Sequence, residues 1–339
     1  MQDIADHCGI SRTVVSLVLN GRDKKLKIAE KTRNRILEAA SRLGYCRNEM
    51  AVSLVKTKAP ILAFASTEMG GVAYTGRIQN GILDGATASD YAVLTYRLTA
   101  DNHEEILRKI KGWRVSGVLF HISRLDDYRD LFEDLDANEI PYVTVNLANP
   151  NGLGVTSDDT QGVFDAVGML AKAGCRKIAF VTYTHNIMKH EYMQRRMDGY
   201  CAGIRHFLPE QTPCIMDYCS EEMAPNENYQ KLIKQITAIQ ADGVICVSDH
   251  IAYLLRQMLP HDSHVRIVGY GGVLPYVYPP LPTICQDFEE MGRKSVHLLC
   301  NAINGQKNEE NNILLPVRVA LYDKNNNQQK QQPTKRRRS

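Results

Sequence analysis

Several features are missing from this 339-residue sequence, and each absence removes a class of protein. No apolar run approaches the roughly 18–20 residues that span a bilayer, and no charged-then-apolar signal opens the chain, so no membrane contact or export is expected. The nine cysteines are scattered without a CxxC pair, which supports neither a disulfide framework nor a zinc site. We therefore expect a cytoplasmic protein with reduced, mostly buried thiols.

Motifs of enzyme chemistry are also missing. The histidines lie beside no GxSxG, P-loop or HExxH sequence, and no carboxylate pair has a spacing typical of a catalytic site. The nearest approach to such a dyad is the adjacent pair Asp158 and Asp159. The sequence therefore predicts a protein that is not an enzyme and that holds neither a cofactor nor a metal.

Charge is unevenly distributed, although the whole chain carries a net charge of only +3. Residues 1–58 hold 12 Lys and Arg against 6 Asp and Glu, and residues 323–339 hold 6 against 1. Residues 59–322 therefore carry a net charge of −8. A basic head on an acidic body suits a protein whose first domain neutralises DNA phosphates. The tail, rich in Asn and Gln, is predicted to be disordered.

The first twenty or so residues read as two short helices joined by a tight turn. Gly9 is free to take a positive φ at the turn, and Ser11 is a predicted N-cap for the second helix. The second helix has an apolar stripe at Val15, Val18 and Leu19. This is the geometry of a helix-turn-helix unit, in which the start of the second helix enters the major groove of DNA.

The same stretch resembles the opening of the LacI/GalR family of repressors. Four motifs carry the resemblance: Asp3-Ile4-Ala5, Gly9-Ile10-Ser11, Thr13-Val14-Val15-Ser16 and Leu19-Asn20-Gly21. The alternative is a pair of amphipathic helices with an accidental glycine. The family has a few more residues ahead of its first helix, which predicts a start upstream of the present first residue.

Three positions depart from the family's pattern. Cys8 stands where the family usually has Ala, Val14 where it has Thr, and Leu17 where many members have Arg or His. An Arg could read guanine in the major groove, whereas Leu17 offers only apolar contact, for instance to a thymine methyl group. The operator bases opposite this position are therefore left open.

Two further segments complete the predicted DNA-binding region. A third helix is expected after residue 29, with an apolar face of Ile36, Leu37, Ala40 and Leu43, and Ala29 replaces the Ser that often caps it. The segment from residue 48 to 58 resembles the family's hinge helix, whose two copies enter the minor groove and wedge a base step apart with a leucine. The alternative for this segment is a plain linker. The resemblance assigns DNA contacts to Ser11, Arg12, Thr13, Ser16, Leu17, Asn20, Asn48, Ala51 and Leu54.

From Pro60 to residue 322, short apolar runs alternate with helical patterns. This pattern predicts an α/β core of two doubly wound parallel sheets behind the small all-α head. The core also resembles a periplasmic-binding-protein-like fold, through VTSDDTQG (155–162), RRMDGY (195–200), VGYG, PPLPTI (279–284) and LLPVRV. The resemblance implies chain crossings near residues 159, 286 and 314. The predicted boundaries are 1–46 for the head, 47–59 for the hinge and linker, 60–159 with 287–313 for one subdomain, 160–286 with 314–322 for the other, and 323–339 for the tail.

A ligand is expected in a cleft between the two subdomains, because open α/β sheets bind ligands at the carboxyl ends of their strands. The resemblance assigns ligand contacts to Tyr74, Asp158, Arg196, Ser248, Asp249 and Gly271. Arg196 is expected to point a guanidinium without a nearby carboxylate into the cleft. Gly271 and Gly272 replace the aspartates that the family commonly uses to hold a sugar hydroxyl. Three outcomes are therefore open: a ligand that is not an ordinary neutral sugar, an anionic ligand on Arg196, or a lost ligand, with a bound ligand favoured.

The sequence thus supports two hypotheses of function. The first is a homodimeric repressor that binds a palindromic double-stranded operator and responds to a small molecule, expected to be a sugar or sugar derivative. The second is a solute-binding or sensor protein with a vestigial head. A basic three-helix head and the absence of an export signal favour the first hypothesis.

Overall fold

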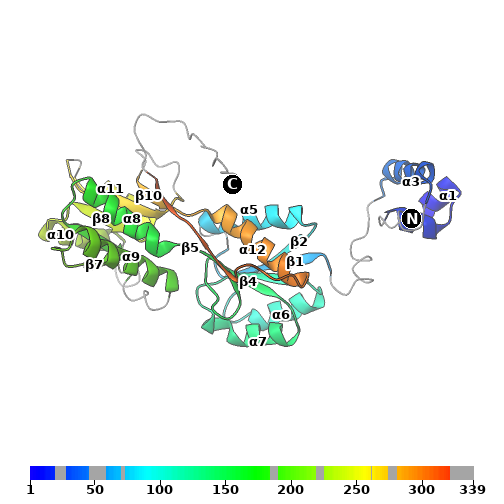
Figure 1. The fold of residues 1–339 in the computed structure, drawn as a ribbon, viewed down its shortest axis with the longest axis horizontal. Helices are drawn as coiled ribbons and strands as arrows, with labels where there is room; N and C mark the ends of the chain where they lie inside the picture. Colours follow the sequence, from blue (N-terminus) through cyan, green and yellow to red (C-terminus); the bar gives the residue numbers. More distant parts are fainter. Residues whose placement is uncertain are drawn as a thin grey trace. The chain divides into compact units, whose positions relative to one another are not determined.

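The computed structural model describes residues 1–19, 28–45, 59–69, 73–183, 190–218, 225–260, 262–273 and 281–320. The chain divides into two compact units, Met1–Ala59 and Pro60–Ser339, each with its own hydrophobic core (Figure 1). Among the described residues, no helix is both long and apolar enough to cross a bilayer.

In its described residues, the head contains three helices, α1 (Gln2–Cys8), α2 (Arg12–Leu19) and α3 (Glu30–Arg42). Gly9 ends α1 with φ 59°, a left-handed conformation that glycine adopts readily, and this allows the tight turn into α2. Both predicted helices of the helix-turn-helix unit are confirmed. Their shared core consists of Ile4, Ala5, Cys8, Val15, Val18, Ile36, Ala39 and Ala40.

The predicted apolar face of α3 was wrong at two positions. Leu37 is 38% exposed and Leu43 is 47% exposed, whereas Ala39 is buried beside Ile36. Leu37 follows Ile36 by one residue, a rotation of about 100° that turns it away from the core. Leu43 lies at the C-cap, beyond the last helical turn. The missing cap is confirmed, since Ala29 at the N-cap makes no side-chain hydrogen bond.

The part of the second unit that the structure describes contains two six-stranded sheets. The first has the order β11-β5-β4-β3-β1-β2 and is parallel throughout. The second has the order β12-β10-β9-β8-β6-β7, and its edge strand β12 is antiparallel to β10. The first sheet's strands are β1 (Ile61–Ser66), β2 (Ala92–Arg97), β3 (Gly117–His121), β4 (Tyr142–Val145), β5 (Leu153–Ser157) and β11 (Asn312–Leu315). The second sheet's strands are β6 (Ile178–Thr182), β7 (Cys214–Asp217), β8 (Gly243–Cys246), β9 (Arg266–Gly271), β10 (Thr283–Cys285) and β12 (Arg318–Ala320).

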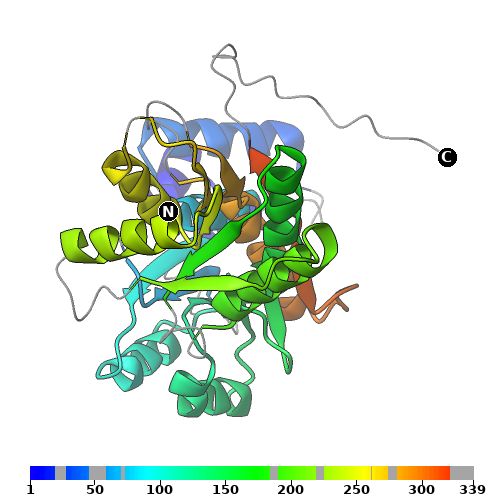
Figure 2. The ribbon, with the colours of Figure 1, turned by 90° about the vertical axis from the view of Figure 1, so that its left-hand side faces the viewer.

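Helices cover both faces of each sheet, which explains why central strands such as β3 and β6 are buried along their whole length. The first sheet carries α5 (Ala73–Ala88) and α12 (Phe288–Ile303) on one face, and α6 (His103–Gly112) and α7 (Arg129–Ala137) on the other (Figure 1). The second sheet lies between the pair α8 (Asp159–Lys172) and α9 (Glu191–Phe207) and the pair α10 (Pro225–Ala238) and α11 (Asp249–Met258) (Figure 2).

The predicted fold class is confirmed: two doubly wound α/β sheets follow a small helical domain. The chain passes between the sheets three times, after β5, after β10 and after β11. Two features differ from the expectation. Helix α12 was not among the predicted elements. Strand β12 breaks the parallel pattern because it begins soon after β11 and joins the edge of the other sheet antiparallel to β10.

Candidate DNA-binding and effector sites

The exposed start of α2 is the candidate DNA-reading surface of the head. The Ser11 hydroxyl accepts a hydrogen bond from the Val14 amide at 3.4 Å, which confirms Ser11 as the cap of this helix. Arg12 and Thr13 follow on the same exposed end. Cationic and hydroxyl side chains at an accessible helix N-terminus can reach both phosphates and base edges.

The other predicted DNA-contact residues are distributed more widely. Ser16 and Leu17 are half-buried on α2, one turn further along. Cys8 is buried in the head core, with its sulfur 3.7 Å from the Arg35 carbonyl oxygen, so its departure from the family's Ala changes packing and not the DNA-facing surface. Four predicted contacts lie outside the described residues: Asn20, Asn48, Ala51 and Leu54.

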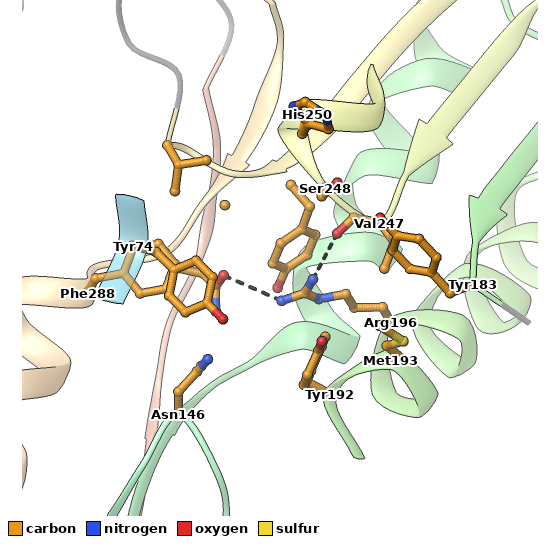
Figure 3. A pocket seen from close by; sticks show the side chains of 14 residues that line it. Tyr74, Asn146, Tyr183, Tyr192, Met193, Arg196, Val247, Ser248, His250 and Phe288 are labelled. Carbon is orange, nitrogen blue, oxygen red and sulfur yellow. Dashed lines mark hydrogen bonds between the residues drawn. The ribbon is translucent and has the colours of Figure 1, made fainter. Parts of the chain in front are cut away.

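A pocket of about 380 Å³ lies between the two sheets of the second unit (Figure 3). Tyr74 on α5 and Phe288 on α12 contribute from the first sheet's side, and Arg196 on α9 contributes from the second sheet's side. The full lining is Tyr74, Asn146, Tyr183, Tyr192, Met193, Arg196, Val247, Ser248, His250, Tyr270, Gly271, Val273, Gln286 and Phe288. The pocket volume and mixed apolar and polar lining suit a small organic molecule.

Arg196 is held inside the protein by a network of partners. Its Nε donates to Asp159 Oδ1 at 3.1 Å, its Nη1 to the Val247 carbonyl at 2.8 Å, and its Nη2 to Gln286 Oε1 at 3.4 Å. The guanidinium also lies over the Tyr270 ring, 3.6 Å from the ring centroid. The expectation that no carboxylate lies near Arg196 was therefore wrong, because Asp159, 37 residues away in sequence, neutralises it.

Asp159 organises this network from the first turn of α8. It is fully buried, and besides Arg196 it accepts hydrogen bonds from Arg195 Nη2 at 3.0 Å and from the Tyr270 hydroxyl at 2.5 Å. Burial alone would lower the pKa of Arg196, but Asp159, Tyr270 and Tyr192 outweigh it and raise the pKa overall. Burial and the neighbouring carboxylate raise the pKa of Tyr270. The guanidinium is thus charged and the phenol neutral.

The two glycines at the end of β9, Gly271 and Gly272, have backbone conformations that an aspartate rarely adopts. Gly271 has φ 121° and Gly272 has φ 69°, and a Cβ at Gly272 would lie 2.9 Å from the Cys285 sulfur. The carboxylate near this turn comes instead from Asp249, which accepts hydrogen bonds from the Val273 amide at 2.7 Å and from the Thr283 hydroxyl. The backbone therefore disfavours the family's usual aspartates at this turn.

Tyr74 forms part of an aromatic wall of the pocket. Its ring stacks on Phe288 with centroids 5.2 Å apart, and its hydroxyl donates to the Glu68 carboxylate. Burial and the Glu68 charge raise the pKa of Tyr74 well above its ordinary value. Beneath the ring, His121 Nδ1 lies 3.0 Å from the Ser66 hydroxyl oxygen, and burial lowers the pKa of His121.

Comparisons with known proteins agree with this division of the chain. Residues 1–48 match the family of bacterial regulatory proteins described as lacI family, and residues 167–321 match the periplasmic binding protein-like domain. The HTH-type transcriptional regulator RegA of Clostridium saccharobutylicum is 25% identical over 93% of this chain and 96% of its own length. Catabolite control protein A of Priestia megaterium is 26% identical over 94% of this chain and 96% of its own length.

The chain thus combines a lacI-family DNA-binding domain with a periplasmic-binding-protein-like domain. Its relatives are transcriptional regulators and not enzymes.

Solved structures of LacI-family regulators share this fold. The Lac repressor dimer bound to operator and the anti-inducer ONPF matches with a TM-score of 0.74, at 19% identity, over 94% of this chain and 96% of that chain. The complex of the regulator CelR with cellobiose matches with a TM-score of 0.65, at 21% identity, over 94% and 98%.

Of the six ligand contacts predicted from the LacI-family pattern, four line the pocket: Tyr74, Arg196, Ser248 and Gly271. Asp158 and Asp249 are not among the described lining residues. The carboxylate of Asp158 instead caps α8 by accepting a hydrogen bond from the Gln161 backbone amide at 3.0 Å. The carboxylate of Asp249 accepts a hydrogen bond from the Val273 backbone amide at the turn after β9. The predicted pocket contact of these two carboxylates is therefore corrected, because both make internal hydrogen bonds.

Asn146 is a lining residue that the sequence interpretation missed. It directly follows β4, has φ 63°, and its amide oxygen Oδ1 is buried without a hydrogen-bond partner. Figure 3 shows its side chain pointing toward the middle of the pocket. The available signal was weak: an Asn at the carboxyl end of a predicted parallel strand, where ligands of α/β sheets bind.

Proposed function

We propose that the chain is a homodimeric repressor that binds a palindromic operator and changes its DNA affinity when a small molecule occupies the pocket. The observation that carries this proposal is the exposed Ser11-Arg12-Thr13 end of α2 in a region, residues 1–58, with a net charge of +6. A solute-binding protein with a vestigial head would need neither the basic surface nor an intact helix-turn-helix core.

In this proposal Arg12 and Thr13 read bases in the major groove from the start of α2. Leu54 of the hinge segment is the minor-groove wedge, and Asn48 and Ala51 support it from the same segment. Wedging kinks the duplex at a cost of a few kcal/mol of unstacking, which extra contacts on both half-sites offset. Two heads related by two-fold symmetry require a palindromic site, and the place of action is the cytoplasm.

The effector is proposed to act by moving one subdomain relative to the other. The pocket takes side chains from both sides, and Ser157 and Gln286, joined by a hydrogen bond of 2.5 Å, lie where the chain passes between the sheets. A ligand that binds one arrangement better shifts the spacing of the two hinge segments and couples the pocket to the operator by about 1–3 kcal/mol. The family resemblance and the cellobiose named for CelR point to a sugar or sugar derivative.

Selection of bound duplexes from a random DNA pool tests this proposal. The full chain should enrich one palindromic sequence, and affinity for it should fall steeply with salt because counterions are released on binding. Enrichment of a non-symmetric site would exclude the symmetric homodimer. No enrichment at any salt concentration would favour the sensor with a vestigial head.

A further inference from the structure

We infer that the pocket takes an uncharged aromatic compound that carries one amide-like edge. This inference rests on the proposed function, and it specifies the class of ligand that the regulatory pocket binds. It departs from the expectation of a hydroxyl-rich or anionic sugar derivative. The same side chains give three independent arguments, from charge, from hydrogen-bonding capacity and from shape.

The charge balance around the pocket disfavours an anionic ligand. Among the described lining residues, Arg196 is the one with a permanent positive charge, and the buried Asp159 carboxylate neutralises it. The Glu68 carboxylate accepts a hydrogen bond from the Tyr74 hydroxyl, and Asp249 Oδ2 lies 3.9 Å from the position a Cβ would take at Gly271. A phosphate or carboxylate would therefore enter without an uncompensated cation to bind and would face two further carboxylates.

Five of the nine polar side chains that line the pocket make hydrogen bonds inside the protein: Tyr74, Arg196, Ser248, Tyr270 and Gln286. Arg196 donates from all three of its nitrogens, and Gln286 accepts from Arg196 and donates to Ser157. The hydroxyls of Tyr74 and Tyr270 donate to carboxylates. A monosaccharide would bury several hydroxyls here, and each one left without a partner would weaken binding by the cost of its desolvation. The lining therefore favours a ligand with few polar atoms.

The shape of the lining favours a flat ring. Tyr74 and Phe288 stack with an angle of 24° between their planes and form one wall. Figure 3 shows Tyr183 and Arg196 on the opposite side, with Tyr192 below the guanidinium. Aromatic rings in offset-stacked or edge contacts bind more tightly than the apolar area they bury would give alone. A planar ring between these two sides makes such contacts.

Asn146 supplies the polar contact that orients such a ring. Its Oδ1 is a buried acceptor without a partner, and the same amide carries two N–H donors. The backbone at this residue is fixed, because the main-chain N–H of Asn146 donates a hydrogen bond of 2.8 Å to the Val155 carbonyl oxygen. A planar group that presents one donor and one acceptor side by side, such as an amide or lactam, can pair with both the oxygen and an N–H of the Asn146 side chain.

Titration of the full chain with five small probes tests the inference, followed by calorimetry or ligand-observed NMR to about 10 mM, since ligands of this size bind weakly. Benzamide, benzoate and benzylammonium share a ring and differ in charge. Cyclohexanecarboxamide keeps the amide and loses the aromatic ring, and methyl glucoside offers hydroxyls. We expect benzamide to bind about tenfold more tightly than each of the others. Tighter binding of benzoate, benzylammonium or methyl glucoside, or no binding of benzamide, would overturn the inference.

The variant Asn146→Asp locates the site of binding. Asp tolerates a positive φ nearly as well as Asn, so the backbone is preserved, but the amide donors are replaced by a charged oxygen. We expect benzamide affinity to fall about tenfold. The matched control is Asn138→Asp, an exposed position at the end of α7, which should leave the affinity unchanged. Equal affinities of both variants and the parent would remove Asn146 from the site.

Operator binding by the same preparations separates this inference from the proposed function. If the full chain binds its selected DNA and methyl glucoside releases it, the regulator proposal stands and the aromatic ligand is wrong. If benzamide binds and the chain enriches no DNA, the ligand class stands and the regulator proposal fails.

Discussion

Replacing the buried carboxylate of Asp159 should destabilise the core more than any neighbouring change of the same chemistry. Asp159→Asn keeps the size of the side chain but removes the negative charge that faces Arg195 Nη2 at 3.0 Å and Arg196 Nε at 3.1 Å. Arg196 is only 7% exposed, so its charge would remain buried without a counter-ion. Breaking a buried pair in this way costs about 3–5 kcal/mol.

Thermal unfolding of the full chain, followed by calorimetry, measures this loss. A decrease of 3–5 kcal/mol should lower the Tm of the core transition by about 10 °C for a unit of this size. The matched control is Asp158→Asn, the same substitution one residue earlier. Because Asn caps a helix about as well as Asp, this control should change stability by less than about 0.5 kcal/mol.

A second variant checks that the loss comes from the unpaired charge. Combining Asp159→Asn with Arg196→Met removes both charges, and the double variant should be more stable than Asp159→Asn alone. A Tm for Asp159→Asn within about 2 °C of the parent, which corresponds to about 1 kcal/mol or less for a unit of this size, would refute the assigned role of the pair. A double variant less stable than the single one would show that shape, and not charge, holds this site.

Three further outcomes are expected. Arg12→Ala should weaken operator binding by about 1–3 kcal/mol and relax selectivity at one base pair per half-site in competition assays; a uniform loss over all sequences would make Arg12 a phosphate contact. Leu54→Ala should weaken specific binding and reduce the bend in circular-permutation gel shifts, whereas an unchanged bend would contradict a wedge. Burial lowers the pKa of His121, so its contribution to stability is present above about pH 6.5 and is lost as the pH falls through the folded value. The urea midpoint of His121→Asn should therefore decline less between pH 7.5 and 5.5 than that of the parent. Equal declines would exclude His121 as a source of the pH dependence of stability.

The head and the alternation of strands and helices were predictable because their signals are local. Gly9 and Ser11 mark a turn and a cap within three residues, and the long apolar strands differ clearly in period from the amphipathic helices. The three-residue strands β10 and β12 are too short to show a period, which is why the antiparallel edge was not predicted.

The chemistry of the pocket was only partly predictable, because it depends on contacts between distant residues. Tyr74 and Arg196 were assigned correctly to the lining from the family's pattern. The partners of Arg196 lie 37 and 90 residues away in sequence, at Asp159 and Gln286, and no local spacing indicates them. The same holds for Asn146, whose importance depends on a left-handed backbone and an unpaired oxygen that become visible only in three dimensions.

Binding of the full chain to its selected operator and to a scrambled duplex of equal length, at one salt concentration, tests the central claim most directly. Fluorescence anisotropy should show the palindrome bound at least about 10³-fold more tightly than the scrambled duplex, with two chains per palindrome. Equal affinity for both duplexes would contradict a sequence-specific regulator, and one chain per palindrome would contradict the dimer.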